Sequence, residues 1–234
     1  MTAHAPAVSA SRALPASGLL LGGLFAVYAV LVVTAPIDFR QGVVQKILYV
    51  HVPCAFSAYL GFLVTAVAGA LFLWRSDPRL DRVALAGAEV GVVFCTLVLV
   101  SGPIWAKATW GEWWAEWDPR LTVSLIQWFV YVAYLLLRAF AEGSERAARF
   151  AAVYGIAGVC AIPLNYFAIE LFGGGRAAHP ANLGRGSLGE GFGWPFLAGV
   201  ATSFAAFLHL LLLRIDLETR RNAREEGAEA LEAH

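Results

Sequence analysis

The sequence predicts an all-α, polytopic membrane protein with six transmembrane helices. Three observations support this fold class. Of the 234 residues, 59% are hydrophobic and only 15% are charged, whereas soluble domains are typically about 45 to 50% apolar. The mean hydropathy is +0.65. Finally, the chain contains six apolar runs close to the roughly 20 residues that an α-helix needs to cross a bilayer.

Each apolar run is expected to be a helix, because lipid offers the backbone no hydrogen-bond partners. The runs extend over residues 18–35, 48–74, 83–105, 121–140, 147–172 and 195–215. Prolines at or near the ends of these runs, where a missing N–H costs least, are Pro36, Pro78, Pro103 and Pro195. Pro163 instead lies inside the fifth run and predicts a kink near Asn165.

The basic residues predict the orientation, because cytoplasmic loops carry the excess of Lys and Arg. One side of a six-helix chain holds Arg12, Arg75, Arg79, Arg82, Arg138, Arg146, Arg149, Arg214, Arg220, Arg221 and Arg224. The other side holds Arg40, Lys46, Lys107, Arg120, Arg176 and Arg185. Both termini are therefore expected in the cytoplasm. We divide the chain into a six-helix transmembrane domain (residues 1–216), with an outer tryptophan-rich loop (105–122), and a charged cytoplasmic tail (217–234).

Composition and motifs argue against several function classes. The formal net charge is zero and no dense basic tract occurs, so nucleic acid is not an expected partner. Cys54, Cys95 and Cys160 fall in different runs without metal-ligand spacing, and we interpret them as small core residues. The sequence has no nucleophile elbow, Walker motif, HExxH or dinucleotide fingerprint, which argues against a conventional enzyme.

The most unusual segment is WGEWWAEWDPRLT at residues 110–122, between the third and fourth runs. Its tryptophans are Trp110, Trp113, Trp114 and Trp117. Four indoles expose about 600 to 1,000 Å² of mostly apolar surface, an upper-bound cost of roughly 15 to 25 kcal/mol in water. They are expected to lie either at the membrane interface, as an aromatic belt, or against a large flat apolar ligand.

The tryptophan spacing favours a ligand. If the segment is helical, the four indoles occupy positions i, i+3, i+4 and i+7 and form a continuous aromatic shelf on one face. Asp118 and Arg120 close this shelf, and Pro119 is expected to end the helix near Asp118. Arg120 or Lys107 would pair with a ligand carboxylate, although either would also suit the headgroup level of the bilayer.

Two histidines share the outer side with this segment. His51 precedes Pro53, which suits a first helical position and places His51 where the second helix emerges. His179 precedes Pro180 in the glycine-rich third outer loop. Two neutral imidazoles that flank the tryptophan run in the chain are suited to be the axial ligands of a haem iron. Taken singly, each histidine also fits a hydrogen-bonded structural role.

Two other function classes stay open at this point. A small-solute or ion transporter needs polar groups and broken helices near the membrane midplane, and here the candidates are His209, Asn165 and the kink at Pro163. A structural subunit of a larger membrane complex needs no ligand. Packing or a helix-to-helix hydrogen bond is the expected role of His209, and Glu89 and Glu170 are expected to reach the interfaces.

The residues described above carry a family resemblance. Residues 110–122 resemble the signature WGxWWxWDxRLT of the tryptophan-rich haem-handling membrane proteins of cytochrome c biogenesis. Residues 46–53, KILYVHVP, resemble the KIxYxHVP segment of one branch of that family, haem exporter protein C. The length and the six predicted helices are similar to this branch over nearly the whole chain.

The resemblance implies that haem b is held at the periplasmic face of the bacterial inner membrane. On this sequence, it implies His51 and His179 as the axial ligands of the haem iron. It implies a haem platform made of Trp110, Trp113, Trp114, Trp117, Asp118 and Arg120. It further implies transfer of haem to a membrane-anchored periplasmic haem chaperone, with ATP-binding cassette subunits of the cytochrome c maturation system helping to release the loaded chaperone.

Overall fold

The protein is a multi-pass helical membrane protein. The computed structural model describes residues 10–115, 118–140, 144–172, 179 and 188–232, and these ranges contain helices and no β-strand. Six segments are long and apolar enough to cross a membrane, which confirms the predicted fold class. They are Leu14–Thr34, Val43–Arg75, Pro78–Trp110, Pro119–Phe140, Glu145–Tyr166 and Gly193–Arg224.

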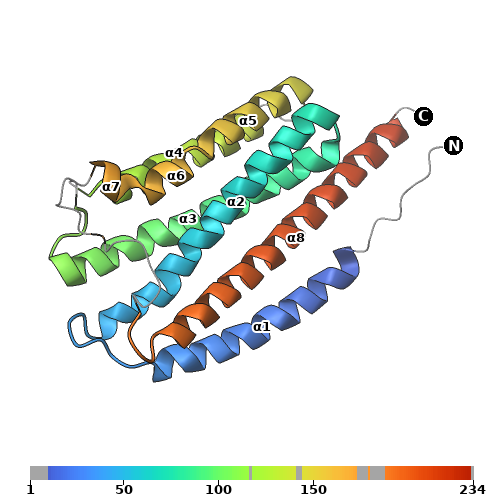
Figure 1. Cartoon of the computed structure of the whole chain (residues 1–234). Helices are drawn as coiled ribbons and strands as arrows, with labels where there is room; N and C mark the ends of the chain where they lie inside the picture. The colour runs from blue at the N-terminus through green and yellow to red at the C-terminus, as the bar shows by residue number, and fades with distance from the viewer. Residues whose placement is uncertain (1–9, 116–117, 141–143, 173–178, 180–187, 233–234) are drawn as a thin grey trace.

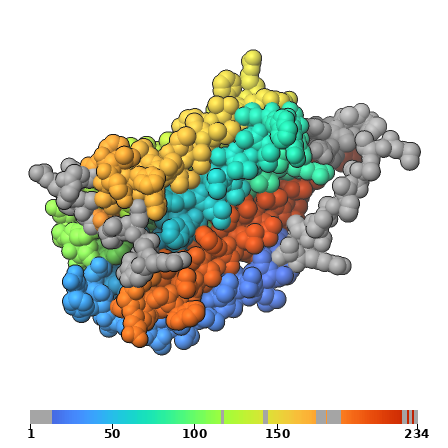
Figure 2. Space-filling view, in the orientation of Figure 1, coloured from blue at the N-terminus to red at the C-terminus, as the bar shows by residue number. Residues whose placement is uncertain are grey.

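The helices form three layers (Figure 1). In chain order they are α1 (Ala10–Thr34), the 3-10 helix η1 (Val43–Ile47), α2 (Leu48–Arg75), α3 (Pro78–Trp110), α4 (Pro119–Phe140), α5 (Glu145–Gly158), α6 (Ala161–Tyr166), α7 (Ala168–Phe172) and α8 (Gly193–Glu232). The central layer is the pair α2 and α3, with α4 and α5 on one side and α8 and α1 on the other. In Figure 2, α2 lies between α5 and α8 on the visible face, and α1 borders α8.

The central pair packs closely because glycines face each other. A Cβ atom added to Gly61 of α2 would lie 2.6 Å from the Cα of Gly91 and 2.8 Å from the carbonyl oxygen of Gly87, both on α3. No side chain larger than hydrogen fits there. Small residues at a helix contact let two backbones approach closely in a bilayer, where the hydrophobic effect between helices is absent. The glycines therefore set the spacing of the layer on which the other helices pack.

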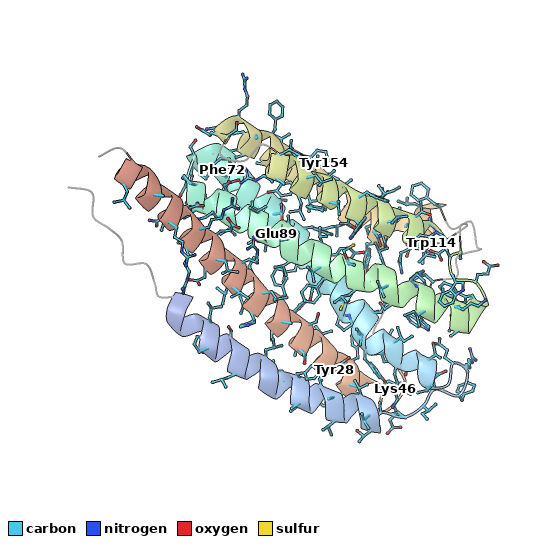
Figure 3. The ribbon with its side chains drawn as sticks, turned by 180° about the vertical axis from the view of Figure 1, so that it is seen from behind. Tyr28, Lys46, Phe72, Glu89, Trp114 and Tyr154 are labelled. Atoms are coloured by element: carbon cyan, nitrogen blue, oxygen red, sulfur yellow. The ribbon has the colours of Figure 1, made fainter. Side chains whose placement is uncertain are left out.

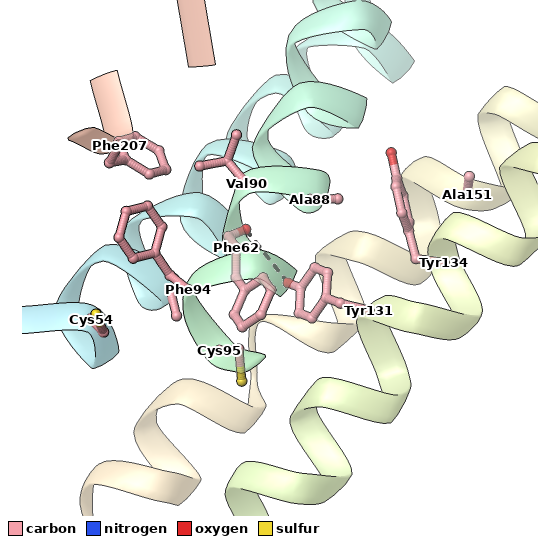
Figure 4. Close-up of a cluster of buried hydrophobic side chains, with 11 residues drawn as sticks. Cys54, Phe62, Ala88, Val90, Phe94, Cys95, Tyr131, Tyr134, Ala151 and Phe207 are labelled. Carbon is pink, nitrogen blue, oxygen red and sulfur yellow. Dashed lines mark hydrogen bonds between the residues drawn. The ribbon is translucent and has the colours of Figure 1, made fainter. Parts of the chain in front are cut away.

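Aromatic side chains fill the space between the central pair and α4 (Figure 4). The ring of Phe62 stacks on that of Tyr131 with a centroid distance of 3.7 Å and an interplanar angle of 12°. Both residues are fully buried. The Tyr131 hydroxyl donates a hydrogen bond of 3.1 Å to the carbonyl of Gly155, so one side chain of α4 contacts α2 and α5 together.

Local signals explain where several helices begin and end. Asp77 caps α3 by accepting a hydrogen bond from the amide of Arg79, and Pro78 occupies the first turn. At the end of α2, Ser76 adopts the left-handed conformation and its amide donates to the carbonyl of Phe72. The ammonium group of Lys46 donates to the carbonyls of Val32 and Val33 in the last turn of α1.

Pro53 was expected at the first position of its helix, and this prediction is wrong. His51 does lie in the first turn of α2. The helix begins at Leu48, so Pro53 lies inside it. A proline at this position leaves the carbonyl of Tyr49 without its usual i+4 amide donor. The hydroxyl of Tyr28 on α1 donates to that carbonyl instead, at 3.2 Å. The bundle thus tolerates an internal proline because a neighbouring helix supplies the missing donor.

The fifth apolar run is interrupted twice, and the interruption at Phe167 lies near Asn165, where Pro163 predicts a kink. One interruption lies between Gly158 and Ala161, on the N-terminal side of the proline. Pro163 has no N–H for the carbonyl of Val159, and the amide of Ile162 donates to that carbonyl at 3.0 Å. A second interruption, at Phe167, separates α6 from α7.

Three smaller expectations have mixed outcomes. The imidazole of His209 lies 2.9 Å from the hydroxyl of Ser17 on α1, which confirms a helix-to-helix hydrogen bond. Cys54 and Cys95 are buried, but Cys160 is exposed, so its predicted core position is wrong. Cys160 lies at the break between α5 and α6. The tail continues α8 without a break as far as Glu232. The membrane side of the tail stays a prediction.

We expect Gly61→Ala to lower the free energy of unfolding by about 1 to 3 kcal/mol, because the added methyl group overlaps the backbone of α3. Thermal unfolding of the detergent-purified protein measures the change. Gly22→Ala in α1 is the matched control, since a Cβ there meets nothing within 4 Å. Equal unfolding temperatures for the two variants would contradict the close packing of α2 on α3.

Candidate functional site

At one end of the bundle, side chains from α2, α3, α4 and α6, together with Trp114 and His179, surround a small cavity. Figure 3 labels Trp114 and Lys46 near this end and Phe72 near the opposite end. The cavity has a volume of about 60 Å³ and its lining includes His51, Trp114, Arg120 and His179. Four of the residues predicted for the site are therefore neighbours, although they are separated by up to 128 positions in the sequence.

His51 is held in a fixed orientation against α3. Its side chain is buried, and its Nδ1 atom lies 2.9 Å from the hydroxyl oxygen of Ser101. Ser101 donates its own proton to the carbonyl of Leu97 at 2.7 Å, so its oxygen is the acceptor and His51 Nδ1 carries hydrogen. Gly102 makes room for the ring, since a Cβ there would lie 3.2 Å from His51 Cε1. The lone pair of His51 is consequently on Nε2.

His179 lies directly beside His51. The two ring centroids are 6.4 Å apart with an interplanar angle of 36°. The ring of Trp110 meets His179 edge-on at 5.6 Å. The backbone amide of His179 donates to Asp118 Oδ2 at 2.8 Å, and the Nδ1 atom lies 3.4 Å from Asp118 Oδ1. The two histidines of the sequence prediction are thus brought together by the fold.

Asp118 is the buried anchor of this end of the bundle, with no exposed surface. It accepts the amide of His179 and, at 3.0 Å, the amide of Arg120 in the first turn of α4. Burial by itself raises the pKa of the Asp118 carboxyl. The hydrogen bonds and charge interaction from His179, together with the Arg120 amide, outweigh burial and hold this pKa at about 2. Asp118 is therefore ionised and accepts hydrogen bonds from the backbone amides of His179 and Arg120.

Arg120 points across the bundle to the broken fifth span. Its guanidinium donates to the carbonyl of Tyr166 at 3.1 Å. Next to it, Asn165 accepts a hydrogen bond from the Tyr59 hydroxyl and donates one to Ser124, both at 2.8 Å. This polar network forms one wall of the cavity. The sequence does not predict that Tyr59, Ser124 and Asn165 are neighbours, because they belong to three different helices that only the fold brings together.

The tryptophan segment does not form the predicted helical shelf. Helix α3 ends at Trp110, and Gly111 follows it with a φ of +83°, a left-handed conformation that favours glycine and stops the helix. Pro119 begins α4 instead of ending a helix. Trp110 and Trp114 consequently face the histidines, whereas Trp113 is 60% exposed. Trp117 lies outside the described residues.

Two further residues complete the description of this end. Lys107, considered as a carboxylate partner, donates its ammonium group to the Gly111 carbonyl at 2.7 Å and caps the end of α3. Trp105, absent from the predicted site, meets the ring of His51 edge-on at a centroid distance of 5.9 Å. Its position at the end of the third apolar run was the only sequence signal for Trp105. Its place beside His51 depends on how α2 packs on α3.

The distance between the histidines suits a shared metal. Two imidazole nitrogens bound to one metal at about 2.0 to 2.1 Å each place their ring centroids roughly 6 Å apart. Both Nδ1 atoms face protein oxygens, on Ser101 and Asp118, which is how metal-binding imidazoles are commonly oriented. The cavity itself holds about two water molecules, so a flat ligand the size of a porphyrin requires the surrounding segments to separate.

Comparisons with known proteins give a consistent result. A family model described as "Heme exporter protein C" matches residues 4–229. Heme exporter protein C of Paracoccus denitrificans is 33% identical over 188 residues, which cover 80% of this chain and 78% of that protein. Heme exporter protein C of Rhodobacter capsulatus is 32% identical over 199 residues, 84% of this chain and 80% of that protein. A putative cytochrome c biosynthesis ccmC-like mitochondrial protein of Arabidopsis thaliana is 32% identical over 186 residues, which cover 80% of this chain and 68% of that protein.

We expect Asp118→Asn to destabilise the protein by roughly 2 kcal/mol near neutral pH, because the folded state stabilises the ionised form of Asp118 relative to its neutral form. The pKa is lower in the folded state, so this contribution is fully present above about pH 4 and is lost as the pH falls through 3.8 toward 2. Thermal unfolding of both proteins at pH 6 and pH 2.5 checks this. If the stability difference between the wild type and Asp118→Asn were the same at both pH values, the charge of Asp118 would have no role.

Proposed function

The chain belongs to the heme exporter protein C family, and we propose that it binds haem b between His51 and His179 at the periplasmic face of the bacterial inner membrane. In this proposal it passes haem to a membrane-anchored periplasmic haem chaperone for cytochrome c maturation. The coarser role, haem handling for cytochrome c biogenesis, is supported by the family match and by the names of the relatives.

The pairing of His51 with His179 is the observation that carries the proposal. Each imidazole has its Nδ1 atom beside a protein oxygen, so we assign its Nε2 atom as the one that would bind a metal. Among the described residues no group of three or more His, Cys, Asp or Glu side chains is arranged to hold a metal ion. Two protein ligands alone suit an iron whose other ligands come from a porphyrin.

The surrounding residues suit a large, flat, anionic cargo. Trp110 contacts the His179 ring, and Trp114 offers apolar surface in the cavity. Arg120 lines the same cavity, and its guanidinium matches the geometry of a carboxylate such as a haem propionate. Asp118 holds the His179 backbone and the start of α4, so it positions His179 and Arg120 relative to each other.

Delivery requires a surface that a partner reaches. Trp113 is the exposed tryptophan next to the site, and we assign it to contact with the haem chaperone. Binding, orientation and exchange of iron ligands are the whole task in this proposal, so none of these residues has a catalytic role. ATP-binding cassette subunits of the cytochrome c maturation system are further proposed partners, as is the lipid bilayer around the helices.

The polar groups that a transporter would need near the midplane are engaged in packing. His209 pairs with Ser17, and Asn165 is bonded to Tyr59 and Ser124 beside the cavity. These contacts favour the haem-handling proposal over a solute pathway along the fifth and last spans.

We expect His51→Ala to weaken haem binding by at least about 100-fold, because it removes one of the two proposed iron ligands. The visible absorption spectrum of the purified protein, titrated with haem, measures this as loss of the Soret band. His209→Ala is the matched control, since His209 is bonded to Ser17 and lies in another part of the bundle. An unchanged spectrum for His51→Ala would reject the ligand assignment.

The two adjacent tryptophans are expected to differ. Trp114→Ala removes apolar surface from the cavity and is expected to lower haem retention about tenfold. Trp113→Ala leaves retention near the wild-type level but reduces the covalent haem found on a co-expressed periplasmic chaperone. Soret absorbance and haem staining of the chaperone separate the two effects. Equal loss of retained haem in both variants would contradict the division of roles.

A further inference from the structure

A second, larger cavity lies at the end of the bundle opposite His51 and His179. It has a volume of about 1000 Å³ and is bordered by the first turns of α3 and α5, the end of α4 and the C-terminal half of α8. Figure 3 labels two residues of its lining, Phe72 and Glu89, toward this end. Part of the lining belongs to the membrane-spanning segments Pro78–Trp110 and Gly193–Arg224. The lining thus includes residues at or near the ends of spanning segments, where lipid headgroups are expected.

Every carboxylate that borders this cavity already has a guanidinium partner. The pairs are Asp81 with Arg138 at 2.7 Å, Glu218 with Arg214 at 2.8 Å, Glu145 with Arg149 at 3.0 Å, and Glu89 with Arg214. The carboxylates of the lining are therefore already engaged in ion pairs. An additional cation would find no free carboxylate here.

Hydrogen-bond donors, in contrast, are left over. Arg82 lines the cavity and forms no ion pair with any side chain that the structure describes, and its Nε atom is buried without a hydrogen-bond partner. The Nε atom of Arg138 is in the same situation, because its contact with Asp81 uses Nη2. A buried N–H without an acceptor is costly. An anion with several acceptor oxygens would satisfy both N–H groups.

We propose that this cavity binds the phosphate headgroup of an anionic phospholipid from the leaflet at this end of the bundle, with Arg82 as the principal donor. A guanidinium presents a fork of N–H groups that matches phosphate oxygens. Basic pockets between transmembrane helices are suited to anionic headgroups. Phe72, Leu85 and Leu136 give the cavity an apolar wall for the glycerol and the upper acyl chain, which free phosphate does not need. The site is separate from the haem-handling role proposed above.

The test uses the full chain purified in detergent. Its unfolding temperature and its native mass spectrum are measured with added phosphatidylglycerol, with phosphatidylcholine, whose choline cancels the phosphate charge, and with inorganic phosphate. We expect stabilisation and a retained lipid with phosphatidylglycerol only. Arg82→Gln is expected to weaken phosphatidylglycerol binding at least about fivefold. Arg79→Gln, which removes an exposed arginine of the same helix outside the cavity, keeps wild-type binding.

Several outcomes would overturn the proposal. Equal stabilisation by phosphatidylcholine would show a non-selective lipid contact. Phosphate that stabilises as well as phosphatidylglycerol, and does so only with Arg82 present, would show a small-anion site. Equal losses in the Arg79 and Arg82 variants would show a diffuse surface charge, and no binding of any probe would leave the cavity to a protein partner. If Arg82→Gln does not fold, Arg82→Lys keeps the charge without the fork, and wild-type binding by that variant would also contradict the assignment.

Discussion

The close contact of α2 with α3 is the constraint on which the rest of the structure depends. Gly61, Gly87 and Gly91 let the two backbones touch, and both outer layers pack on the resulting pair. Toward one end of this pair, the same approach places the ring of His51 against Gly102 and within hydrogen-bond distance of Ser101. Packing at the glycines and the orientation of the imidazole are therefore parts of one helix interface.

Asp118 connects that interface to the chain segments that follow it. A buried carboxylate is stable only when hydrogen-bonded, and here the donors come from α4 and from His179, which is 61 positions further along the chain. The ionised carboxylate thus helps to fix the position of His179 relative to the start of α4. The cavity at the opposite end of the bundle has the reverse balance, because the carboxylates that border it are paired with guanidinium groups and arginine N–H groups are left over. The two ends are suited to different ligands.

Much of the fold follows from the sequence alone. The six spans are visible as apolar runs, because a helix must satisfy its own backbone in lipid, and their limits agree with the structure within a few residues at most ends. The residue types of the site were also identifiable, since tryptophan, histidine, aspartate and arginine rarely gather in such apolar surroundings. His51, His179, Trp114 and Arg120 do line one cavity. The assignment of that cavity to haem remains a proposal.

The tertiary structure decided how these residues are arranged. The tryptophan spacing suggested a helical shelf, but α3 ends before Gly111, which adopts a left-handed conformation, and Trp113 is exposed. Pro53 lies inside α2 because Tyr28, on another helix, supplies the donor that proline lacks. Ser101, Trp105 and Asn165 join the site only through helix packing. The pattern of apolar residues predicts where a helix forms and how polar it is on average. Contacts between residues far apart in the chain depend on how close two helices come, and here that distance is set by glycines in α2 and α3.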